Sequence, residues 1–454
     1  MSQIQQSKNT CSHHSITYTS SPHAAQTKYK QPTQRQRINA TKPKPNANLS
    51  DPPTRTDLDN FPAPLILPED DLALNPEQPP QSFQKWHDMK TRNKVTPERR
   101  TIYILPPPGF DGGVDDDIHL WTLPRGYHTR QQLSTPSHED TIAYLSAFYT
   151  GLAVKRLQIP NWNFHCWTEG RMPMRRQKFI GVTTKTKSTR IRMRKAPDGL
   201  YPFQLNLEDL LNVAINVLPA DAFALCMLMD HDLYEDEEDT FTCGRAYGGR
   251  RVSVVSTARY NPLLDEEQFG EREHAWPASH CTEYIQSLCN LTEPTPKKKK
   301  TASKPSTSPE KHPDNITPLQ LALTSFISCP PLSNSSPDSL LTILWLFRIC
   351  RTTSHELGHC FGIAHCTYHA CIMQGSASLA EDARQPPELC PVDLAKLLFA
   401  TGESMRGRYT KLLEFCGRKG VCEGAGFAAL GGWVRGSMRV LNGDEGGGAD
   451  ADED

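Results

Sequence analysis

One stretch of the chain places histidine, glutamate and glycine at the spacing of a catalytic zinc site. It reads Thr352-Thr-Ser-His355-Glu356-Leu-Gly-His359-Cys-Phe-Gly362-Ile-Ala-His365, which fits H-E-x-x-H-x-x-G-x-x-H at every fixed position. A chain of this composition would contain the eleven-residue form by chance on the order of 0.0001 times. The pattern is therefore a specific signal for zinc chemistry.

Each fixed position has a physical reason. His355 and His359 are four residues apart, so on a helix both imidazoles project from one face toward a single ion. Gly362 lies where the helix must stop, because a residue without Cβ can adopt a positive φ, and the turn brings His365 round as the third ligand. Three imidazoles leave the fourth tetrahedral position open to water, as in catalytic zinc sites.

Glu356 stands next to a ligand and is predicted to face that open position. Zinc lowers the pKa of bound water to about 7, and a carboxylate there acts as a general base that passes the proton to the leaving amine. The motif thus predicts zinc-dependent hydrolysis of peptide bonds. The alternatives are a helix with ordinary surface histidines, and a catalytically silent zinc protein that acts through partner interactions.

A second pattern, made mostly of cysteines, follows His365. It consists of Cys366, Cys371, Met373-Gln-Gly-Ser376 and Leu389-Cys390-Pro391-Val-Asp393. With the zinc motif, this run resembles the archaemetzincins, a family of zinc metallopeptidases among the metzincins. The resemblance implies that Met373 makes the Met-turn beneath the catalytic zinc. It further implies a second, structural zinc on the cysteines, and an aminopeptidase-like activity on peptides.

One position departs from the family pattern, because Asp393 stands where the family has its fourth cysteine. An aspartate oxygen can ligate zinc, so Cys366, Cys371, Cys390 and Asp393 remain a possible second site beside the catalytic zinc. Two alternatives stay open. Cys360, Cys416 or Cys422 could replace Asp393, or the second zinc could be absent and the three cysteines left as buried thiols.

The elements that must position these residues are predicted from hydrophobic periodicity. We expect strands at Thr101–Leu105, Ala222–Met229 and Arg251–Tyr260 and helices at Glu139–Val154, Leu207–Val217 and from Leu340 into the motif. The fold class is therefore α/β (α+β). The resemblance implies a metzincin-like zincin domain with a mixed twisted sheet, an active-site helix and a Met-turn, flanked by disordered tails.

The strand at Arg251–Tyr260 is expected to form the edge of the sheet along the cleft. In metzincins generally, such an edge strand pairs with extended substrate through its main chain. By this analogy Gly249, Val252 and Val254 are predicted to bind substrate.

Composition defines the predicted domain organisation. With 37 Pro and an apolar share of only 37%, much of the chain is not expected to be packed core. We expect a disordered Pro/Ser/Gln-rich tail at 1–97 and a peptidase domain at 98–415. Residues 290–338 read as a low-complexity insert and 416–454 as a Gly-rich, acidic tail.

Charge and cysteine content limit the class of partner. The formal net charge of -1 gives no pull toward nucleic acid or anionic membrane, and the longest apolar stretch near the motif is too short to span a bilayer. The expected partner is a peptide or protein substrate. The 14 cysteines, without a secretory signal, indicate thiols and metal ligands in the cytoplasm or nucleus. The acid-poor first fifty residues make mitochondrial import the alternative.

Several other polar residues carry no predicted role. His231, His274, His280 and His369 share no face with the motif by local spacing, and Glu381, Asp382 and Glu388 read as loop carboxylates that could bind a substrate amino terminus. The run from Lys297 to Lys300 reads as a solvated loop, with nuclear import or phosphate binding as alternatives.

Overall fold

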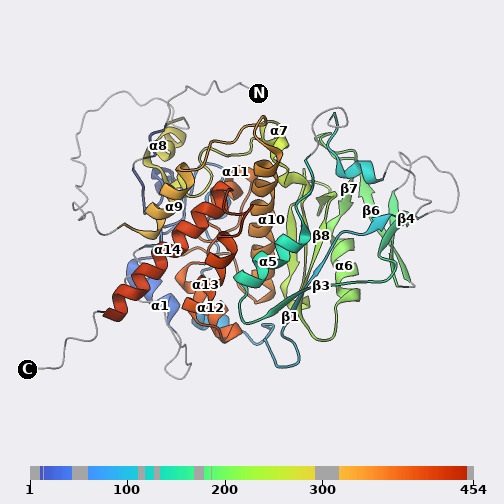
Figure 1. Ribbon diagram of the computed structural model, residues 1–454, viewed down its shortest axis with the longest axis horizontal. Coiled ribbons are helices and arrows are strands. Elements are labelled where there is room, and N and C mark those ends of the chain that lie inside the picture. Colours follow the sequence, from blue (N-terminus) through green and yellow to red (C-terminus); the bar gives the residue numbers. More distant parts are fainter. Residues whose placement is uncertain are drawn as a thin grey trace, which may run out of the picture.

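A computed structural model describes residues 11–13, 15–42, 60–110, 118–126, 133–167, 178–185, 187–291 and 316–446. Figure 1 shows two sheets at one side of the molecule and a group of helices at the other, with the long helix α10 (Asp338–Cys360) between them. This mixed architecture confirms the predicted α/β class.

The first sheet carries the strands that support the site. Its order is β10 (Gly244–Tyr247), β11 (Val252–Ser256), β8 (Ala222–Met229), β1 (Thr101–Leu105) and β3 (Ala153–Arg156). Neighbouring strands are parallel except for β10, which runs antiparallel to β11. The predicted strands at β1 and β8 are confirmed, and β8 lies at the centre.

Strand β8 reads as an unbroken apolar run because both of its faces are buried. Ala224, Cys226 and Leu228 point into the core formed with α10 and α5 (His138–Phe148). The alternate residues Leu225, Met227 and Met229 point into a second core formed with α6 (Leu207–Val217), which matches the predicted helix. Side chains alternate across a strand, so one strand serves both cores.

The predicted helix Glu139–Val154 is too long. Helix α5 ends at Phe148, and the chain turns at Gly151, whose φ is +93°. Ala153 then pairs with Thr101 as the first residue of β3. The apolar residues that prolonged the helical pattern therefore belong to the start of a strand.

The second sheet has the order β2 (Gly109–Phe110), β4 (Asn163–Cys166), β5 (Phe179–Thr184), β6 (Lys187–Arg194), β7 (Gln204–Asn206) and β9 (Asp232–Tyr234). Helix α6 contacts both β6 and β11, so it fills the space between the two sheets. The same sheet supplies Phe164, Val182 and Ile191 to the second core.

Residues within the predicted N-terminal tail are packed against the catalytic domain. Phe83 and Trp86 are fully buried, and the Trp86 Nε1 donates a hydrogen bond of 2.8 Å to the Phe361 carbonyl beside the zinc motif. The tail prediction is therefore wrong for residues 60–97, because scattered aromatic residues between prolines bury well without forming a long element. It is also wrong for the described part of 11–42, where helix α1 (Gln34–Thr41) contacts α12 (Pro391–Thr401) and buries Ala40. Residues 1–10 and 43–59 lie outside the described residues.

The C-terminal prediction is also wrong for most of its length. Helix α14 (Ala425–Gly446) buries Phe427, Leu430 and Trp433 in the main core, and α13 (Met405–Cys416) packs beside it. The glycines of α14 lie where the helix packs closely against its neighbours, and they do not belong to a solvated tail. Residues 447–454 lie outside the described residues.

The partner of α14 is helix α9 (Pro318–Ile327), which lies in the predicted insert. A Cβ at Gly432 would lie 2.6 Å from the Leu321 carbonyl oxygen, and one at Gly436 would lie 2.6 Å from Pro318 Cα. Two glycines four residues apart thus let the helix backbones touch. The insert prediction does not hold for α9, and the Lys297 to Lys300 run lies outside the described residues.

The remaining helices are short. They are α1 (Gln34–Thr41), α3 (Asp71–Leu74), α4 (Phe83–His87), α7 (Asp265–Gln268), α8 (Thr282–Leu291), α11 (Leu379–Arg384), α12 (Pro391–Thr401) and 3-10 turns that include η5 (Gly248–Arg250) and η8 (Ala278–His280). In the part of the chain that the structure describes, none of the helices combines the length and apolarity that crossing a bilayer requires.

The contact between α14 and α9 predicts opposite effects for two neighbouring glycines. Gly432→Ala should lower the free energy of unfolding by about 1–3 kcal/mol, because its Cβ would meet the α9 backbone. Gly431→Ala should be neutral or stabilising by up to about 1 kcal/mol, since its nearest neighbour is the flexible Arg435 side chain at 3.3 Å. Urea unfolding of both variants measures the difference. Equal stability would contradict the close packing.

Candidate metal centre

Helix α10 and the turn that follows it bring the three motif histidines together. His355 and His359 lie on the last turns of α10, and Gly362 adopts a φ of +78° just beyond its end. One ring nitrogen from each of His355, His359 and His365 lies within 4.8 Å of the others. The predicted convergence of the three imidazoles is thus present in the structure.

Main-chain carbonyls fix the orientation of two of these rings. The Nδ1 of His355 lies 2.6 Å from the Ile372 carbonyl oxygen, and the Nδ1 of His359 lies 2.7 Å from that of Ile363. Donation from both Nδ1 atoms leaves a lone pair on each Nε2, and the two Nε2 atoms face one another at 3.0 Å. Two facing lone pairs need a shared cation, so the residues present fit a zinc ion.

Burial sets the protonation state of the site. It lowers the pKa of His355, His359 and His365, and each positive neighbour lowers the pKa further, so the imidazoles are neutral and able to ligate. Burial also raises the pKa of Glu356 to about 8, although Arg245 opposes the shift. A bound cation would favour the Glu356 carboxylate again.

Met373 packs against helix α10 at Gly358. A Cβ on Gly358, which lies between His355 and His359 on α10, would approach the Met373 sulfur to 2.5 Å. The Met373 carbonyl also accepts a hydrogen bond of 2.7 Å from the Cys366 amide. Met373 therefore holds the turn after His365 against the active-site helix.

The second predicted site is also assembled. Ligand atoms of Cys366, Cys371, Cys390 and Asp393 all lie within 4.8 Å of one another, and all four residues are buried. The Cys366 and Cys390 sulfurs are 3.6 Å apart, and Asp393 Oδ2 is 3.4 Å from Cys371 Sγ. Cys360, Cys416 and Cys422 do not belong to this group, so among the described residues Asp393 occupies the fourth position.

Asp393 has a buried counter-charge. Lys396, itself buried, places its Nζ 2.7 Å from Asp393 Oδ1 and leaves Oδ2 directed toward the thiols. Burial and the neighbouring Cys366 together raise the pKa of Asp393 to about 7, although Lys396 opposes the shift. Although burial opposes it, hydrogen bonds from the Cys371 and Cys390 thiols hold the pKa of Cys366 well below its usual value.

Gln81 joins the two centres. Its side-chain oxygen accepts hydrogen bonds from Lys396 Nζ at 2.9 Å and from the Ala364 amide at 3.1 Å, and its amide donates to the Gly362 carbonyl at 3.0 Å. The turn that carries His365 is thereby attached to the cysteine cluster through a residue of the N-terminal segment.

Comparison with known proteins identifies relatives of this chain. The sequence profile of Peptidase family M54 matches residues 338–398. Archaemetzincin-2 of Macaca fascicularis is 24% identical over 356 residues, which cover 78% of this chain and 74% of that protein. Archaemetzincin-2 of Homo sapiens is 25% identical over 356 residues, with the same shares of each chain. The protein is a zinc metallopeptidase related to the archaemetzincins. The predicted resemblance is thus confirmed, and the predicted substrate class of peptides or proteins follows from it.

Solved structures of relatives are more distant. The archaemetzincin of Methanopyrus kandleri is 16% identical and covers 67% of this chain and 96% of its own, with a TM-score of 0.29. The archaemetzincin of Archaeoglobus fulgidus, solved with malonate, is 15% identical and covers 65% and 99%, with a TM-score of 0.29.

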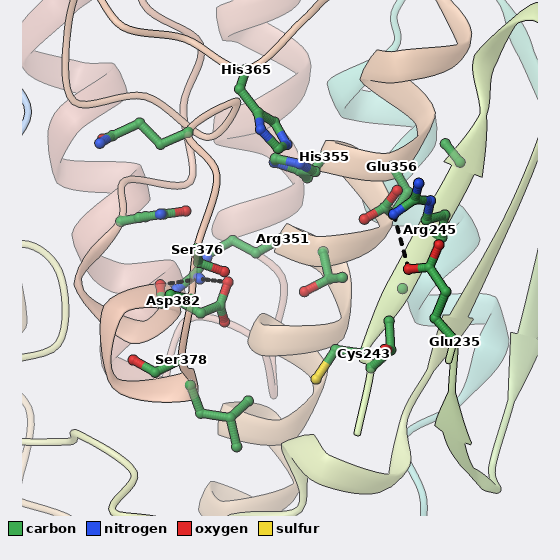
Figure 2. A pocket seen from close by; sticks show the side chains of 18 of the residues that line it. Glu235, Cys243, Arg245, Arg351, His355, Glu356, His365, Ser376, Ser378 and Asp382 are labelled. Atoms are coloured by element: carbon green, nitrogen blue, oxygen red, sulfur yellow. Dashed lines mark hydrogen bonds and ion pairs between the residues drawn. The ribbon is translucent and has the colours of Figure 1, made fainter. Parts of the chain in front are cut away.

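In the present protein, the cleft has a volume of about 1140 Å³ and is lined by all three histidines and Glu356. Figure 2 shows Arg245 of β10 beside Glu356, with Glu235 paired to Arg245 at 2.9 Å. On the opposite side Arg351 of α10 pairs with Asp382 at 2.6 Å. The cleft therefore has a charged pair on each wall, neither of which the sequence motif indicated.

The predicted substrate-binding strand is wrong. Both edges of β11 are occupied, by β8 and by β10, and Val252 and Val254 are fully buried. Gly249 does not line the cleft. The edge strand is β10, whose residues 244–246 do line it. The sequence pattern of alternating residues marked the apolar strand β11 but not the short strand β10 beside it, which has no such pattern.

The N-terminal segment supplies cleft residues that sequence reasoning missed. Gln78 and Pro79 line the cavity. A Cβ on Gly375 would lie 2.4 Å from Asp71 Oδ2 and 3.0 Å from His365 Nδ1, so the Asp71 carboxylate stands behind the third histidine. Its charge raises the pKa of His365, although burial outweighs it. Nothing in the local sequence at Asp71 signals this role.

The residues without a predicted role separate into two groups. His231, His280 and His369 are buried core histidines, and burial lowers the pKa of each to about 4. Glu381 accepts hydrogen bonds from the Ala377 and Asp71 amides. Glu388 is buried away from the cleft, whereas Asp382 lines it.

The Asp393 and Lys396 pair predicts a large effect for one lysine. Lys396→Met should destabilise the protein by about 3–5 kcal/mol, because it leaves the buried Asp393 carboxylate without a counter-charge. Lys411→Met is the matched control, since Lys411 pairs with Glu414 three residues away but both are more than half exposed. It should cost less than about 1 kcal/mol. Urea unfolding compares the two, and equal values would show that the pair does not hold the cluster.

Proposed function

We propose that the protein hydrolyses peptide bonds at one zinc ion held by His355, His359 and His365, with Glu356 as general base and acid. The observation that carries the proposal is the pair of facing Nε2 atoms at 3.0 Å, beside a buried carboxylate that lines the cleft. Zinc, when bound, polarises the substrate carbonyl and activates water. Glu356 takes the proton and returns it to the leaving amine, while Met373 and Gly362 hold the ligands in place.

We propose that extended substrate pairs with β10. Residues 244–246 line the cleft along the edge of the sheet, where main-chain groups can add a further strand. Gly244 lets this strand lie close to Glu356, since a Cβ there would be 3.2 Å from Glu356 Cγ. The peptide bond would then lie between Glu356 and the three histidines.

We also propose a second zinc ion with a structural role. Cys366, Cys371, Cys390 and Asp393 form a buried group without an open side toward the cleft, as expected of a closed site. Lys396 offsets part of the negative charge that three thiolates and a carboxylate would carry.

The general-base role predicts that Glu356→Gln loses activity and keeps zinc. Cleavage of a mixed peptide library should fall by about 10²–10⁴-fold, while zinc per chain, measured by mass spectrometry, stays unchanged. Chelation should abolish the activity of the parent protein. If both proteins retain zinc and neither cleaves, the silent zinc protein that acts through partners becomes the better description.

We propose that cleavage proceeds from the amino terminus of peptides. The Glu238 carboxylate lines the cleft in addition to Glu235 and Asp382, which already pair with arginines, and such a group can pair with a free amino group. A peptide with a free amino terminus should therefore be cleaved at least about 10-fold faster than its acetylated form, since the acetyl group removes the charge.

One cleft carboxylate offers a matched test of this preference. Glu238→Gln should raise the KM for free-amino peptides by about 5-fold, in line with an exposed ion pair of about 1 kcal/mol. Glu237→Gln is the control, because Glu237 is its neighbour, does not line the cleft and lies 3.8 Å from Arg194. Equal cleavage of free and acetylated peptides would instead indicate internal cleavage.

A further inference from the structure

A third cluster of metal-binding residue types lies outside both zinc centres. It consists of Cys11 and His13 at the start of the described chain and Cys281 after η8. One ligand atom from each lies within 4.8 Å of the other two, and Cys281 is buried. The neighbouring residues Glu273 and His274 form a second such group with His13.

Hydrogen bonds that do not involve the sulfur atoms hold the two segments together. Residues 15–17 run antiparallel to 280–282, with Ile16 bridged to Cys281. The contacts are Thr17 N to the His280 carbonyl at 2.9 Å, Thr282 N to the Ser15 carbonyl at 2.9 Å, and Ser12 N to Glu283 Oε2 at 2.9 Å. In Figure 1 the dark blue start of the chain lies beside α8, which begins at Thr282. The approach of Cys11 to Cys281 is therefore built into the fold.

Two imidazoles at this cluster have a ring nitrogen without a hydrogen-bond partner. The Nε2 atoms of His13 and His274 are buried, and neither finds a partner among the described residues. The two ring centroids lie 5.3 Å apart. Buried imidazole nitrogens without partners are rare in folded proteins, and a metal ion satisfies them.

The position of the His274 ring is defined by two neighbours. Its ring stacks on Tyr284 at a centroid distance of 4.0 Å, and its Nδ1 lies 4.0 Å from Glu271 Oε1. The stacked tyrosine fixes the plane of the ring, whereas the Glu271 carboxylate is too far from Nδ1 for a hydrogen bond. Glu271 also accepts the His274 amide at 2.8 Å, so the loop itself is fixed.

We propose that Cys11, His13 and Cys281 hold a third, structural zinc ion, and that His274, which meets His13 in the neighbouring group, turns toward the ion as its fourth ligand. Two thiolates and two imidazoles are a common tetrahedral zinc set, and the ligand atoms of such a site lie about 3.3 to 3.8 Å apart. The four residues come from two segments that are about 260 positions apart in the chain, so the ion clips the N-terminal segment to the catalytic domain. As a free thiol Cys281 has a pKa raised to about 12, mainly by burial, so metal binding must displace its proton.

A zinc ion at this site would also position the N-terminal segment that follows its ligands. The segment that it fixes continues to Tyr29, whose hydroxyl donates a hydrogen bond of 2.9 Å to the Thr367 carbonyl. Thr367 follows Cys366 of the cysteine cluster. Tyr18 of the same segment contacts Thr317 Oγ1 at 2.5 Å, where α9 begins. The third zinc would thus secure a strap that covers the second zinc centre.

The test compares zinc content in full-length proteins purified without chelators. Cys11→Ser and His13→Ala should each lower the zinc content by one ion per chain relative to the parent. Cys166→Ser is the matched control, because Cys166 is half-buried like Cys11 but lies on β4 of the second sheet, and it should keep the parent value. Equal zinc in the parent and in both cluster variants would overturn the proposal.

Alkylation separates a zinc site from a disulfide between the same cysteines. Iodoacetamide labelling of Cys11, read by peptide mass spectrometry, should rise at least tenfold when a chelator is added without reductant. The exposed Cys422 should be labelled equally in both conditions. Labelling of Cys11 that rises with reductant and not with chelator would show a disulfide and reject the third zinc.

Discussion

Two hydrogen bonds from imidazole Nδ1 atoms to main-chain carbonyls determine how the catalytic residues are arranged. They turn the His355 and His359 Nε2 atoms toward each other, and both carbonyl acceptors, Ile363 and Ile372, lie in the turns after α10. Those turns can reach the helix only because Gly358 has no side chain and lets Met373 pack against it. The helix and the turns after it are therefore in direct contact at Gly358, with no room for a side chain there.

Charge is managed differently at each centre. In the cleft, Arg245 and Arg351 face carboxylates on opposite walls, so neither adds an uncompensated positive charge near the ligands. At the cysteine cluster, Lys396 lies behind Asp393 and is held by Gln81. The exchange of a thiolate for a carboxylate is thus accompanied by a buried ammonium group. Such a pair is stable only when both partners keep their hydrogen bonds.

The catalytic residues and the central strands could be predicted from local patterns in the sequence. The spacing from His355 to His365 and the apolar run Ala222–Met229 each depend on neighbours within one element, and both appear in the structure as predicted. The strand β10, the carboxylate of Asp71 and the role of Gln81 could not be predicted in this way. Asp71 and Gln81 contact Glu381 and Ala364, which lie 310 and 283 positions away. Strand β10 pairs with the nearby β11, but it is a short polar strand without a periodic pattern. Helix α14 was missed because its glycines are typical of a tail, whereas their actual role is close packing against α9, an element distant in the sequence.

The packing of the N-terminal segment also constrains the order in which the molecule can form. Trp86 and its acceptor Phe361 are separated by 275 residues, so at ordinary rates of synthesis roughly 14 to 55 s pass between the appearance of one and the other. During that interval Phe83, Trp86 and Leu67 have no binding surface, because the turn and helices that bury them have not yet left the ribosome. The nascent chain must therefore carry an apolar segment unburied, which makes it a natural client for chaperones that shield such segments until synthesis ends.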